Sequence, residues 1–346
     1  MSSAGVATIV YVGNSDSQDI AVLLLQANGE IAPVEMVPVP GPAKPGGSLP
    51  LAVSPNKKFL YAGLRNEPYS VVTFAIAPST GRLTHVGTGP LADSMAYIAT
   101  DRSGRFLLGA SYAGSKVTIN PIGADGIVAP SQQTVASLPN AHCILPDAAN
   151  HYVLYTALGG DVIHQAKFDA KIGKLTPNDP PTVSVKEKAG PRHLIFSPNQ
   201  EFVYLVNELD ASIYVFPYDS ASGTLKKESQ VVSALPTGLA GKPSAADIHV
   251  TPNGKFLYAS ERASSTLAAF RVDHEKGTLT PIDCFATETQ PRGFAIDPSG
   301  RYLLAVGQLS NRMTSYAIDR SNGRLSKLNE YPMGRNPNWV EIVRLP

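Results

Sequence analysis

The stretch FVYLVNE, residues 202–208, decides the fold of this chain, because versions of it return along the whole sequence. Each version begins with an aromatic or β-branched residue and continues with small and apolar residues, as buried strands do. The versions are IVYVGNS from Ile9, FLYAGLR from Phe59, FLLGASY from Phe106, YVLYTAL from Tyr152, FVYLVNE from Phe202, FLYASER from Phe256 and YLLAVGQ from Tyr302. Successive versions start 50, 47, 46, 50, 54 and 46 residues apart. These spacings are typical of β-propeller blades, so the sequence predicts seven repeated units.

Turn signals on both sides of each version predict that a unit is a four-stranded sheet. A short strand and a turn precede most versions, as in RHLIFSPNQEF (192–202) and DIHVTPNGKF (247–256). A second turn follows later in the unit, with Asp and Gly four residues apart, as in Asp219 and Gly223 or Asp273 and Gly277. Two hairpins per unit make a propeller blade, and long helical periodicity is absent. We therefore expect an all-β, seven-bladed propeller.

The two ends of the chain predict how the ring closes. The first unit begins with its second strand, whereas the final piece NPNWVEIVRLP (336–346) resembles a first strand with no partner after it. We expect the strand near Trp339 to pair with the strand near Val10, which removes both open edges. Residues 1–346 would then form one domain. Two domains divided near residue 185 are the alternative that chain length alone favours.

Composition excludes several classes of protein. Hydrophobic residues make up 43% and charged residues 16%, which is too apolar for a disordered chain. The net charge of +1 provides no long-range field for nucleic acid or an anionic membrane. No apolar stretch approaches the roughly 18–20 residues of a membrane span, and the start lacks a basic leader. Cys143 and Cys284 form no C-x-x-C pair, so we expect a cytoplasmic protein. The oligomeric state is left open.

Aligned positions in the units predict a functional rim around the channel. In a hairpin, the start of the first strand and the end of the second lie at the same edge. Ten residues before the repeat anchors stand Leu49, Ala96, His142, Arg192, Ala246 and Arg292. Six residues after the anchors stand Ser15, Arg65, Tyr112, Leu158, Glu208, Arg262 and Gln308, and Asn338 takes the corresponding place on the closing strand. A ring of blades would bring both sets to one mouth.

The composition of this rim favours an anionic ligand. Four arginines accompany a single glutamate, and arginine binds phosphate and carboxylate groups in a bidentate manner. The alternative is that strand ends are solvated and simply collect charged residues. His142 is in register with two of the arginines, which makes it a candidate acid, base or hydrogen-bond donor. His193 and His249 stay ambiguous, and Cys143 should point to the other face as a small buried hydrophobe.

Four segments resemble the seven-bladed propeller lactonase family, which includes bacterial 6-phosphogluconolactonases and fungal 3-carboxy-cis,cis-muconate lactonizing enzymes. They are AGPRHLIFSPN (189–199), VYLVNELDASIYVF (203–216), SAADIHVTPNGKFLYASERASS (244–265) and ETQPRGFAIDPSGRYLLAVGQ (288–308). The resemblance covers essentially the whole chain and implies a catalytic set of His142, Arg192, Glu208 and Arg262. Substrate contacts are expected from Arg65, Tyr112, Arg292, Gln308 and Asn338.

The chemistry that we expect is hydrolysis of 6-phosphogluconolactone to 6-phosphogluconate. Glu208 would act as general base or as a carboxylate that positions the water, Arg192 and Arg262 would bind the anionic group or the oxyanion, and His142 would protonate the leaving alkoxide. We expect no cofactor and no metal, because one carboxylate among arginines is a poor cage for a hard cation. The alternatives are a muconate-type cycloisomerase, a lactonase for a non-phosphorylated sugar lactone, and a binding module without turnover.

Overall fold

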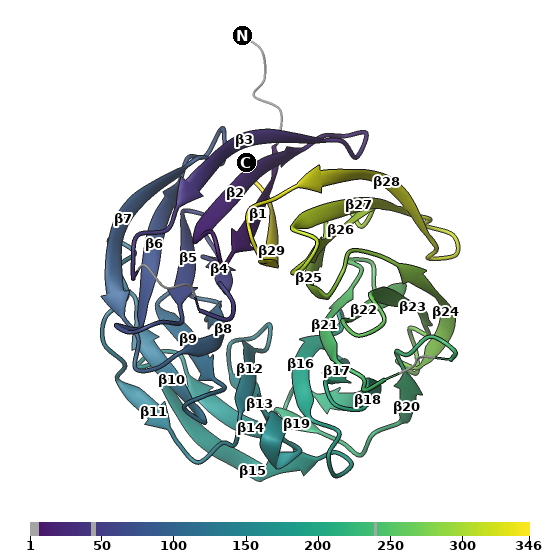
Figure 1. The fold of residues 1–346 in the computed structure, drawn as a ribbon. Coiled ribbons are helices and arrows are strands. Elements are labelled where there is room, and N and C mark those ends of the chain that lie inside the picture. The colour runs from purple at the N-terminus through teal and green to yellow at the C-terminus, as the bar shows by residue number, and fades with distance from the viewer. Residues whose placement is uncertain (1–6, 43–45, 239–240) are drawn as a thin grey trace.

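Seven antiparallel sheets surround a central channel in the computed structural model, which describes residues 7–42, 46–238 and 241–346 (Figure 1). Blade 1 contains β29 and β1–β3, and blades 2 to 7 begin with β4, β8, β12, β16, β21 and β25 in turn. Six sheets have four strands. Blade 5 has five, because two short strands, one after the other, pair with the outer edge of β18. The all-β propeller predicted from the repeats is confirmed. Among the described residues, no helix is long and apolar enough to cross a membrane.

Within each blade, the strands follow one another from the channel outward. The innermost strands are β29 (Pro337–Arg344), β4 (Leu51–Val53), β8 (Met95–Thr100), β12 (Ala141–Pro146), β16 (Pro191–Phe196), β21 (Ala245–Val250) and β25 (Pro291–Ile296). The second strands are β1 (Thr8–Asn14), β5 (Phe59–Leu64), β9 (Phe106–Ser111), β13 (Tyr152–Ala157), β17 (Phe202–Asn207), β22 (Phe256–Glu261) and β26 (Tyr302–Gly307). The second strands contain the repeated anchors.

The third strand of each blade is still largely buried, whereas the outermost strand is more exposed. The third strands are β2 (Asp19–Leu25), β6 (Ser70–Ile76), β10 (Lys116–Pro121), β14 (Val162–Asp169), β18 (Ser212–Asp219), β23 (Thr266–Val272) and β27 (Arg312–Ile318). The outer strands are β3 (Ile31–Pro38), β7 (Leu83–Pro90), β11 (Gln133–Val135), β15 (Lys174–Ser184), β19 (Thr224–Leu225), β20 (Gln230–Ser233), β24 (Leu279–Ala286) and β28 (Leu325–Pro332). A single 3-10 turn, Leu158–Gly160, is the only helical element among the described residues.

The repeated aromatic anchor holds each blade against the next one. Phe202 of blade 5 lies under Gly277 of blade 6, whose φ is +68°, and a Cβ at that glycine would lie 2.3 Å from the Phe202 ring. Glycine adopts this conformation without steric cost, and because it has no Cβ it leaves room for the ring. Tyr204, two residues along the strand, donates a hydrogen bond to the Gly277 carbonyl at 3.0 Å. The repeats that identify the fold in the sequence are therefore the contacts that join neighbouring blades.

The ring closes through the two ends of the chain, as predicted. Strand β29 pairs antiparallel with β1, and Trp339 lies opposite Gly13 while Ile342 lies opposite Val10. The aromatic contact also repeats across this junction, because Tyr302 of blade 7 packs against Gly29 of blade 1. Pairing the first and last strands of the chain leaves blade 1 without an open inner edge.

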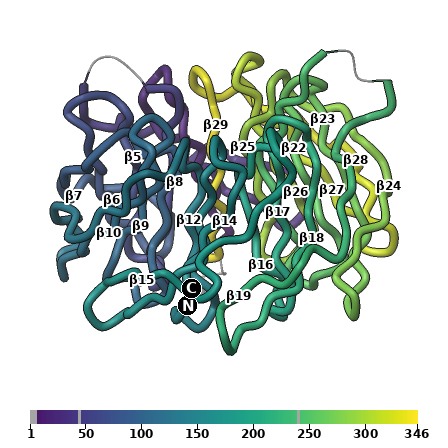
Figure 2. Tube along the Cα trace, turned by 90° about the horizontal axis from the view of Figure 1, so that it is seen from below, coloured from purple at the N-terminus to yellow at the C-terminus, as the bar shows by residue number. Residues whose placement is uncertain are grey.

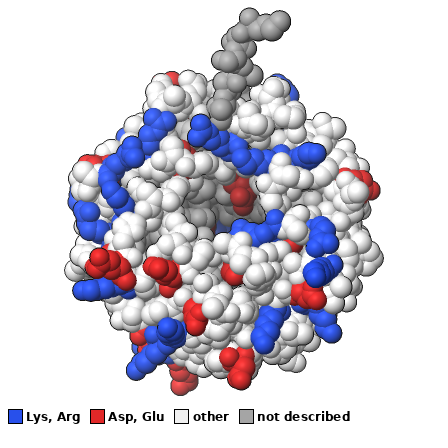
Figure 3. All heavy atoms as spheres, turned by 180° about the vertical axis from the view of Figure 1, so that it is seen from behind, with Lys and Arg blue, Asp and Glu red and all other residues white. Residues whose placement is uncertain are grey.

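One face of the ring holds the starts of the innermost strands, and we call this face the mouth. In blade 5, Pro191 at the start of β16 pairs with Asn207 at the end of β17, so both ends reach this edge. The connections from one blade to the next also lie here, at the top of Figure 2. The chain runs from the mouth to the opposite face along β29. Figure 3 shows that opposite face, where the channel opens as a hollow with Asp or Glu atoms inside it.

Candidate active site

Six of the seven innermost strands carry a β-bulge at the mouth, and only β4, which starts at Leu51, does not. The bulged positions are Ala96, His142, Arg192, Ala246, Arg292 and Asn338. A bulge turns a side chain away from the regular alternation of a strand, and bulges are common beside active sites. These are the positions found in the sequence ten residues before the anchors and at the matching place on the closing strand. The structure thus brings His142, Arg192 and Arg292 to one rim.

Glu208 lies between two arginines from neighbouring blades. It follows β17 and accepts a hydrogen bond from Arg192 Nε at 2.8 Å, while Arg262 Nη2 lies 2.9 Å from its other oxygen. Arg192 is fully buried, and its Nη1 donates to the backbone carbonyl of Ala246. Arg262 Nε is held by the carbonyl of Ser244 at 3.0 Å. The three predicted residues form one rigid ion-pair cluster.

This cluster keeps Glu208 ionised. Burial alone would raise the pKa of Glu208, but the positive charges of Arg192 and Arg262 outweigh it and the pKa lies below its ordinary value. The carboxylate is therefore a weak proton acceptor at neutral pH. Its geometry suits it better to holding the two guanidinium groups in place than to removing a proton from water.

His142 is buried and uncharged in the free protein. Its side chain is 4% exposed, its Nδ1 has no hydrogen-bond partner among the described residues, and the Tyr112 ring lies 5.9 Å away. Burial lowers the pKa of His142 well below the usual value, and the charges of Arg192 and Arg292, among others, lower it further. A neutral imidazole offers a lone pair, whereas the imidazolium expected for an acid is not populated at neutral pH.

The other two rim arginines, Arg65 and Arg292, approach the mouth from blades 2 and 7. Arg65 Nη1 donates to Ser48 Oγ at 2.8 Å, and Arg292 Nη2 lies 3.5 Å from the same oxygen. Neither arginine forms an ion pair with any carboxylate in the described part of the chain. The rim consequently has four arginines and a single paired carboxylate.

Comparison with known proteins agrees with this geometry. A family model described as a seven-bladed β-propeller lactonase matches residues 7–342. The chain belongs to this lactonase family. A 6-phosphogluconolactonase of Pectobacterium carotovorum is 40% identical over 337 residues, covering 97% of this chain and 99% of the relative. A 6-phosphogluconolactonase of Yersinia pestis is likewise 40% identical, over 96% of this chain and 97% of its own length.

A solved structure extends the comparison to a second named activity. The periplasmic gluconolactonase of Pseudomonas aeruginosa superposes with a TM-score of 0.88 at 26% sequence identity, over 98% of this chain and all of the other. Proteins that resemble this chain are thus named for two activities, 6-phosphogluconolactonase and gluconolactonase, which differ in whether the sugar lactone is phosphorylated.

Two further polar residues lie beside Arg192: Asp247, which the sequence reasoning missed, and His193, which it left ambiguous. Arg192 Nη1 lies 3.2 Å from His193 Nε2, and His193 Nδ1 lies 2.8 Å from Asp247 Oδ1. Burial and Arg192 lower the pKa of His193 to about 4, so the ring is neutral. Burial raises the pKa of Asp247, but His249 and the hydrogen bonds from both histidines hold it below its ordinary value. With Nδ1–H donated to this carboxylate, His193 Nε2 accepts from Arg192.

The alternation of side chains along a regular strand left the direction of His193 ambiguous in the sequence, because the bulge at Arg192 shifts that alternation by one residue. Asp247 stands beside a bulged alanine, Ala246, and carries no local signal of its own. Cys143 is fully buried, as expected, and burial raises the pKa of its thiol to about 12.

The remaining predicted substrate contacts differ in their exposure and in whether their polar atoms already have hydrogen-bond partners within the protein. Tyr112 is 37% exposed above His142, and Gln308 Nε2 donates to Asn336 at 2.9 Å. Asn338 is 1% exposed and uses both polar atoms inside the protein: Oδ1 accepts from the Leu49 amide, and Nδ2 donates to Ser15 Oγ at 2.9 Å. We therefore revise the role of Asn338 from substrate contact to support of the loops around the mouth.

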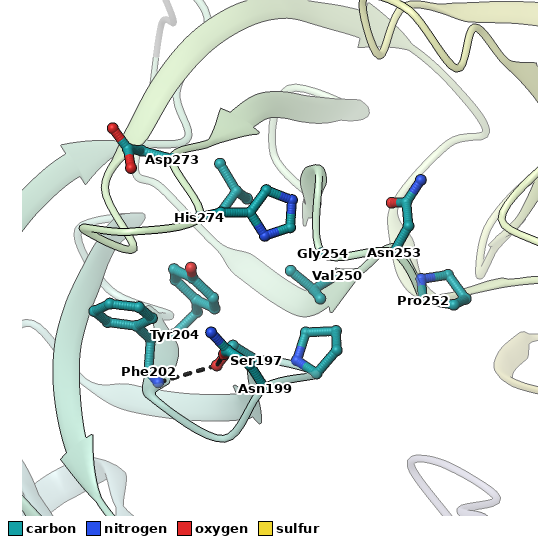
Figure 4. A pocket seen from close by; sticks show the side chains of 12 residues that line it. Ser197, Asn199, Phe202, Tyr204, Val250, Pro252, Asn253, Gly254, Asp273 and His274 are labelled. Atoms are coloured by element: carbon teal, nitrogen blue, oxygen red, sulfur yellow. Dashed lines mark hydrogen bonds between the residues drawn. The ribbon is translucent and has the colours of Figure 1, made fainter.

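A cavity of about 310 Å³ on the opposite face does not belong to the site. It lies where the β16–β17 turn of blade 5 meets the β21–β22 turn of blade 6, and Asn199, Asn253 and His274 line it (Figure 4). None of the rim arginines reaches this cavity. The ion pairs of Glu208 with Arg192 and Arg262 lie at the mouth instead.

Proposed function

We propose that this protein hydrolyses 6-phosphogluconolactone to 6-phosphogluconate, the lactone step of the oxidative pentose phosphate route. The relatives that are 40% identical over almost their whole length have this name. The rim supports the same substrate, since its four arginines outnumber the carboxylates of Glu208 and Asp247 and leave it positively charged. A concave positive site attracts an anionic ligand even when the whole protein is nearly neutral.

The observation that carries the proposal is a pair of polar groups at the mouth that have no partner, one on Arg192 of the ion-pair cluster and one on His142. Arg192 Nη2 and His142 Nδ1 are buried and have no hydrogen-bond partner among the described residues. Buried polar groups are nearly always paired, so an unpaired guanidinium nitrogen and an unpaired imidazole nitrogen at one rim call for a functional explanation. Neither atom has accessible surface in the free protein, so a lactone carbonyl and the water that attacks it would become their partners once the side chains at the mouth shift to admit them.

In the mechanism that we propose, neutral His142 takes a proton from water while the water oxygen attacks the lactone carbonyl carbon. Arg192 and Arg262 stabilise the resulting oxyanion, and Glu208 keeps both guanidinium groups in place. The bond from this carbon to the ring oxygen then breaks, and His142 returns its proton to that oxygen. The histidine is thus base first and acid second, which replaces the division of roles expected from sequence.

An unphosphorylated sugar lactone is the second candidate substrate. The Pseudomonas aeruginosa structure is named a gluconolactonase, and the ion-pair cluster around Glu208 would serve either lactone equally well. The comparisons give no support to the cycloisomerase alternative. Supply of a phosphorylated sugar lactone inside the cell and the two free cysteines support a cytoplasmic location for this protein.

A direct assay tests the proposal. The purified protein is added to freshly generated 6-phosphogluconolactone, and acid release is followed in a pH-stat against the spontaneous rate. We expect rapid hydrolysis by the parent, and a loss of about 10²-fold or more in kcat for Arg192→Ala, because one oxyanion donor is removed. A parent rate equal to the spontaneous one would reject the proposed activity.

A further inference from the structure

Two arginines of the mouth lie outside the ion-pair cluster, and among the described residues their side chains form hydrogen bonds only with serines. Arg65 Nε donates to Ser94 Oγ at 3.0 Å and Arg65 Nη1 donates to Ser48 Oγ at 2.8 Å. Arg292 Nη2 lies within 3.5 Å of Ser48 Oγ. In the described residues no carboxylate pairs with Arg65 or Arg292, so two guanidinium groups meet at one neutral hydroxyl.

Two charges of the same sign at this spot are unfavourable without an anion. Burial lowers the pKa of Arg292 well below its ordinary value, and the charges of Arg192, Arg262 and Arg65 lower it further. Burial also lowers the pKa of Arg65. Buried charges are normally paired, because the loss of hydration must be offset. An anion bound here would offset the repulsion.

The loop before β4 builds this spot. A Cβ at Gly46 would lie 2.6 Å from the Arg65 Cβ, so the loop rests directly on the stem of that arginine. At Gly47 the nearest atom to a Cβ would be Arg65 Nη1 at 3.9 Å, so this glycine lies beside the guanidinium without crowding it. Ser48 is 2% exposed, and its own hydrogen is not donated to any acceptor among the described residues. The hydroxyl is fixed and still has a hydrogen to donate.

We propose that Arg65, Arg292 and Ser48 form a phosphate subsite that is separate from the cluster of Arg192, Glu208 and Arg262. The inference rests on the proposed function, because both groups act on one substrate at one mouth. Guanidinium groups bind phosphate oxygens in pairs, and a serine hydroxyl donates to a third oxygen. Arg65 comes from blade 2 and Arg292 from blade 7, so blade 1 lies between them and the two approach the phosphate from opposite sides.

The positive charge of the subsite and of the ion-pair cluster matches the negative charge of the phosphorylated substrate. The four arginines outnumber the carboxylates of Glu208 and Asp247, so the mouth is positively charged. A phosphate monoester supplies up to two negative charges at neutral pH, and the oxyanion of the lactone supplies one more as the reaction proceeds. An unphosphorylated lactone leaves two arginines without a partner. This subsite therefore selects the phosphorylated lactone over its unphosphorylated counterpart.

The test compares the two lactones in matched variants. For Arg65→Ala and Arg292→Ala we expect kcat/KM on 6-phosphogluconolactone to fall about 30-fold or more, because a charged hydrogen bond is lost, and kcat/KM on glucono-δ-lactone to change less than about threefold. Arg192→Ala should lower both. Arg320→Ala, an exposed arginine on the opposite face, is the control and should lower neither. Equal losses on both lactones for Arg65→Ala and Arg292→Ala would overturn the subsite.

Binding of inorganic phosphate separates this inference from the proposed function. Calorimetry should show weaker phosphate binding by Arg65→Ala, Arg292→Ala and Ser48→Ala than by the parent and by Arg320→Ala. A parent that hydrolyses neither lactone but binds phosphate through these residues would reject the activity and support the subsite. A parent that hydrolyses the phosphorylated lactone and binds phosphate unchanged in all three variants would support the activity and reject the subsite. Circular dichroism confirms that each variant is folded.

Discussion

At the scale of single residues, burial and the neighbouring charges together keep His142 uncharged. Burial is the larger cause, and the same arginines that attract an anion also disfavour a positive imidazole beside them, so the charge of the rim contributes to the state of the histidine. A substrate that brings negative charge to the rim reverses this effect and makes the imidazolium easier to form during the reaction. Substrate charge and proton transfer are therefore coupled at this site.

This coupling predicts the pH dependence of hydrolysis. With glucono-δ-lactone, which has no titrating phosphate, kcat/KM of the parent should stay level as the pH falls through 6.5, because the lowered pKa of His142 keeps its lone pair free. Arg292→Ala removes one positive charge, so the pKa of His142 rises. In this variant kcat/KM should begin to decline at a higher pH than in the parent as the pH falls. A decline at the same or lower pH in the variant would contradict this origin of the shift.

Asp247 is predicted to act as a positioning residue through His193. In Asp247→Asn the carboxylate no longer fixes the Nδ1 proton, so His193 Nε2 is not held as an acceptor for Arg192. We expect kcat to fall about tenfold with little change in KM, as for other residues that orient a ligand-holding side chain. The double variant with Arg192→Ala should be no slower than Arg192→Ala alone. Additive losses would mean that Asp247 acts independently of Arg192.

At the scale of the strands, the bulges determine which side chains point into the mouth. They fall in six innermost strands at equivalent positions, and in β12, β16 and β25 the bulged residue is a polar one that reaches the mouth. The next residue after the β25 bulge, Gly293, lies against the backbone of β29, where a Cβ would be 2.6 Å from the Asn338 carbonyl oxygen. The position of Arg292 thus depends on a close backbone approach between blades 7 and 1.

Gly293→Ala tests this dependence. The added methyl meets backbone rather than a flexible side chain, so overpacking should reduce the free energy of unfolding by about 1–3 kcal/mol. Because Arg292 is displaced as well, kcat/KM on 6-phosphogluconolactone should fall. Gly160→Ala is the control, since its nearest contact would be an ordinary 3.5 Å. Chemical denaturation and the pH-stat assay measure the two effects. Unchanged stability and activity in Gly293→Ala would contradict the close approach.

The fold and the membership of the rim could be predicted from sequence because both depend on a repeated local pattern. Phe202 and Gly277 recur in equivalent positions in the other blades, and counting from the anchor found the bulged residues without any knowledge of a bulge. The roles could not be predicted, since they depend on contacts between blades. The neutral state of His142, the internal hydrogen bonds of Asn338 and the meeting of two arginines at Ser48 leave no trace in any one unit.

At the scale of the whole molecule, the ring depends on its last strand. Removal of residues 337–346 deletes β29, which leaves β1 as an open edge and takes Asn338 away from the loops at Leu49 and Ser15. We expect the shortened chain to aggregate, because an unpaired strand with an exposed apolar face pairs with other copies. Size-exclusion chromatography would show this. A monomeric, active product would contradict the role of β29 in closing the ring.

The order of synthesis gives this closure a further consequence. A ribosome delivers β1 well before β29, so the first blade must wait for residues 337–344 before its sheet is complete. The side chain of Asn338, which supports the loops at Leu49 and Ser15, is delivered in that same strand. The nascent protein therefore has no finished mouth until β29 has been synthesised, and a message interrupted before that point yields an open ring.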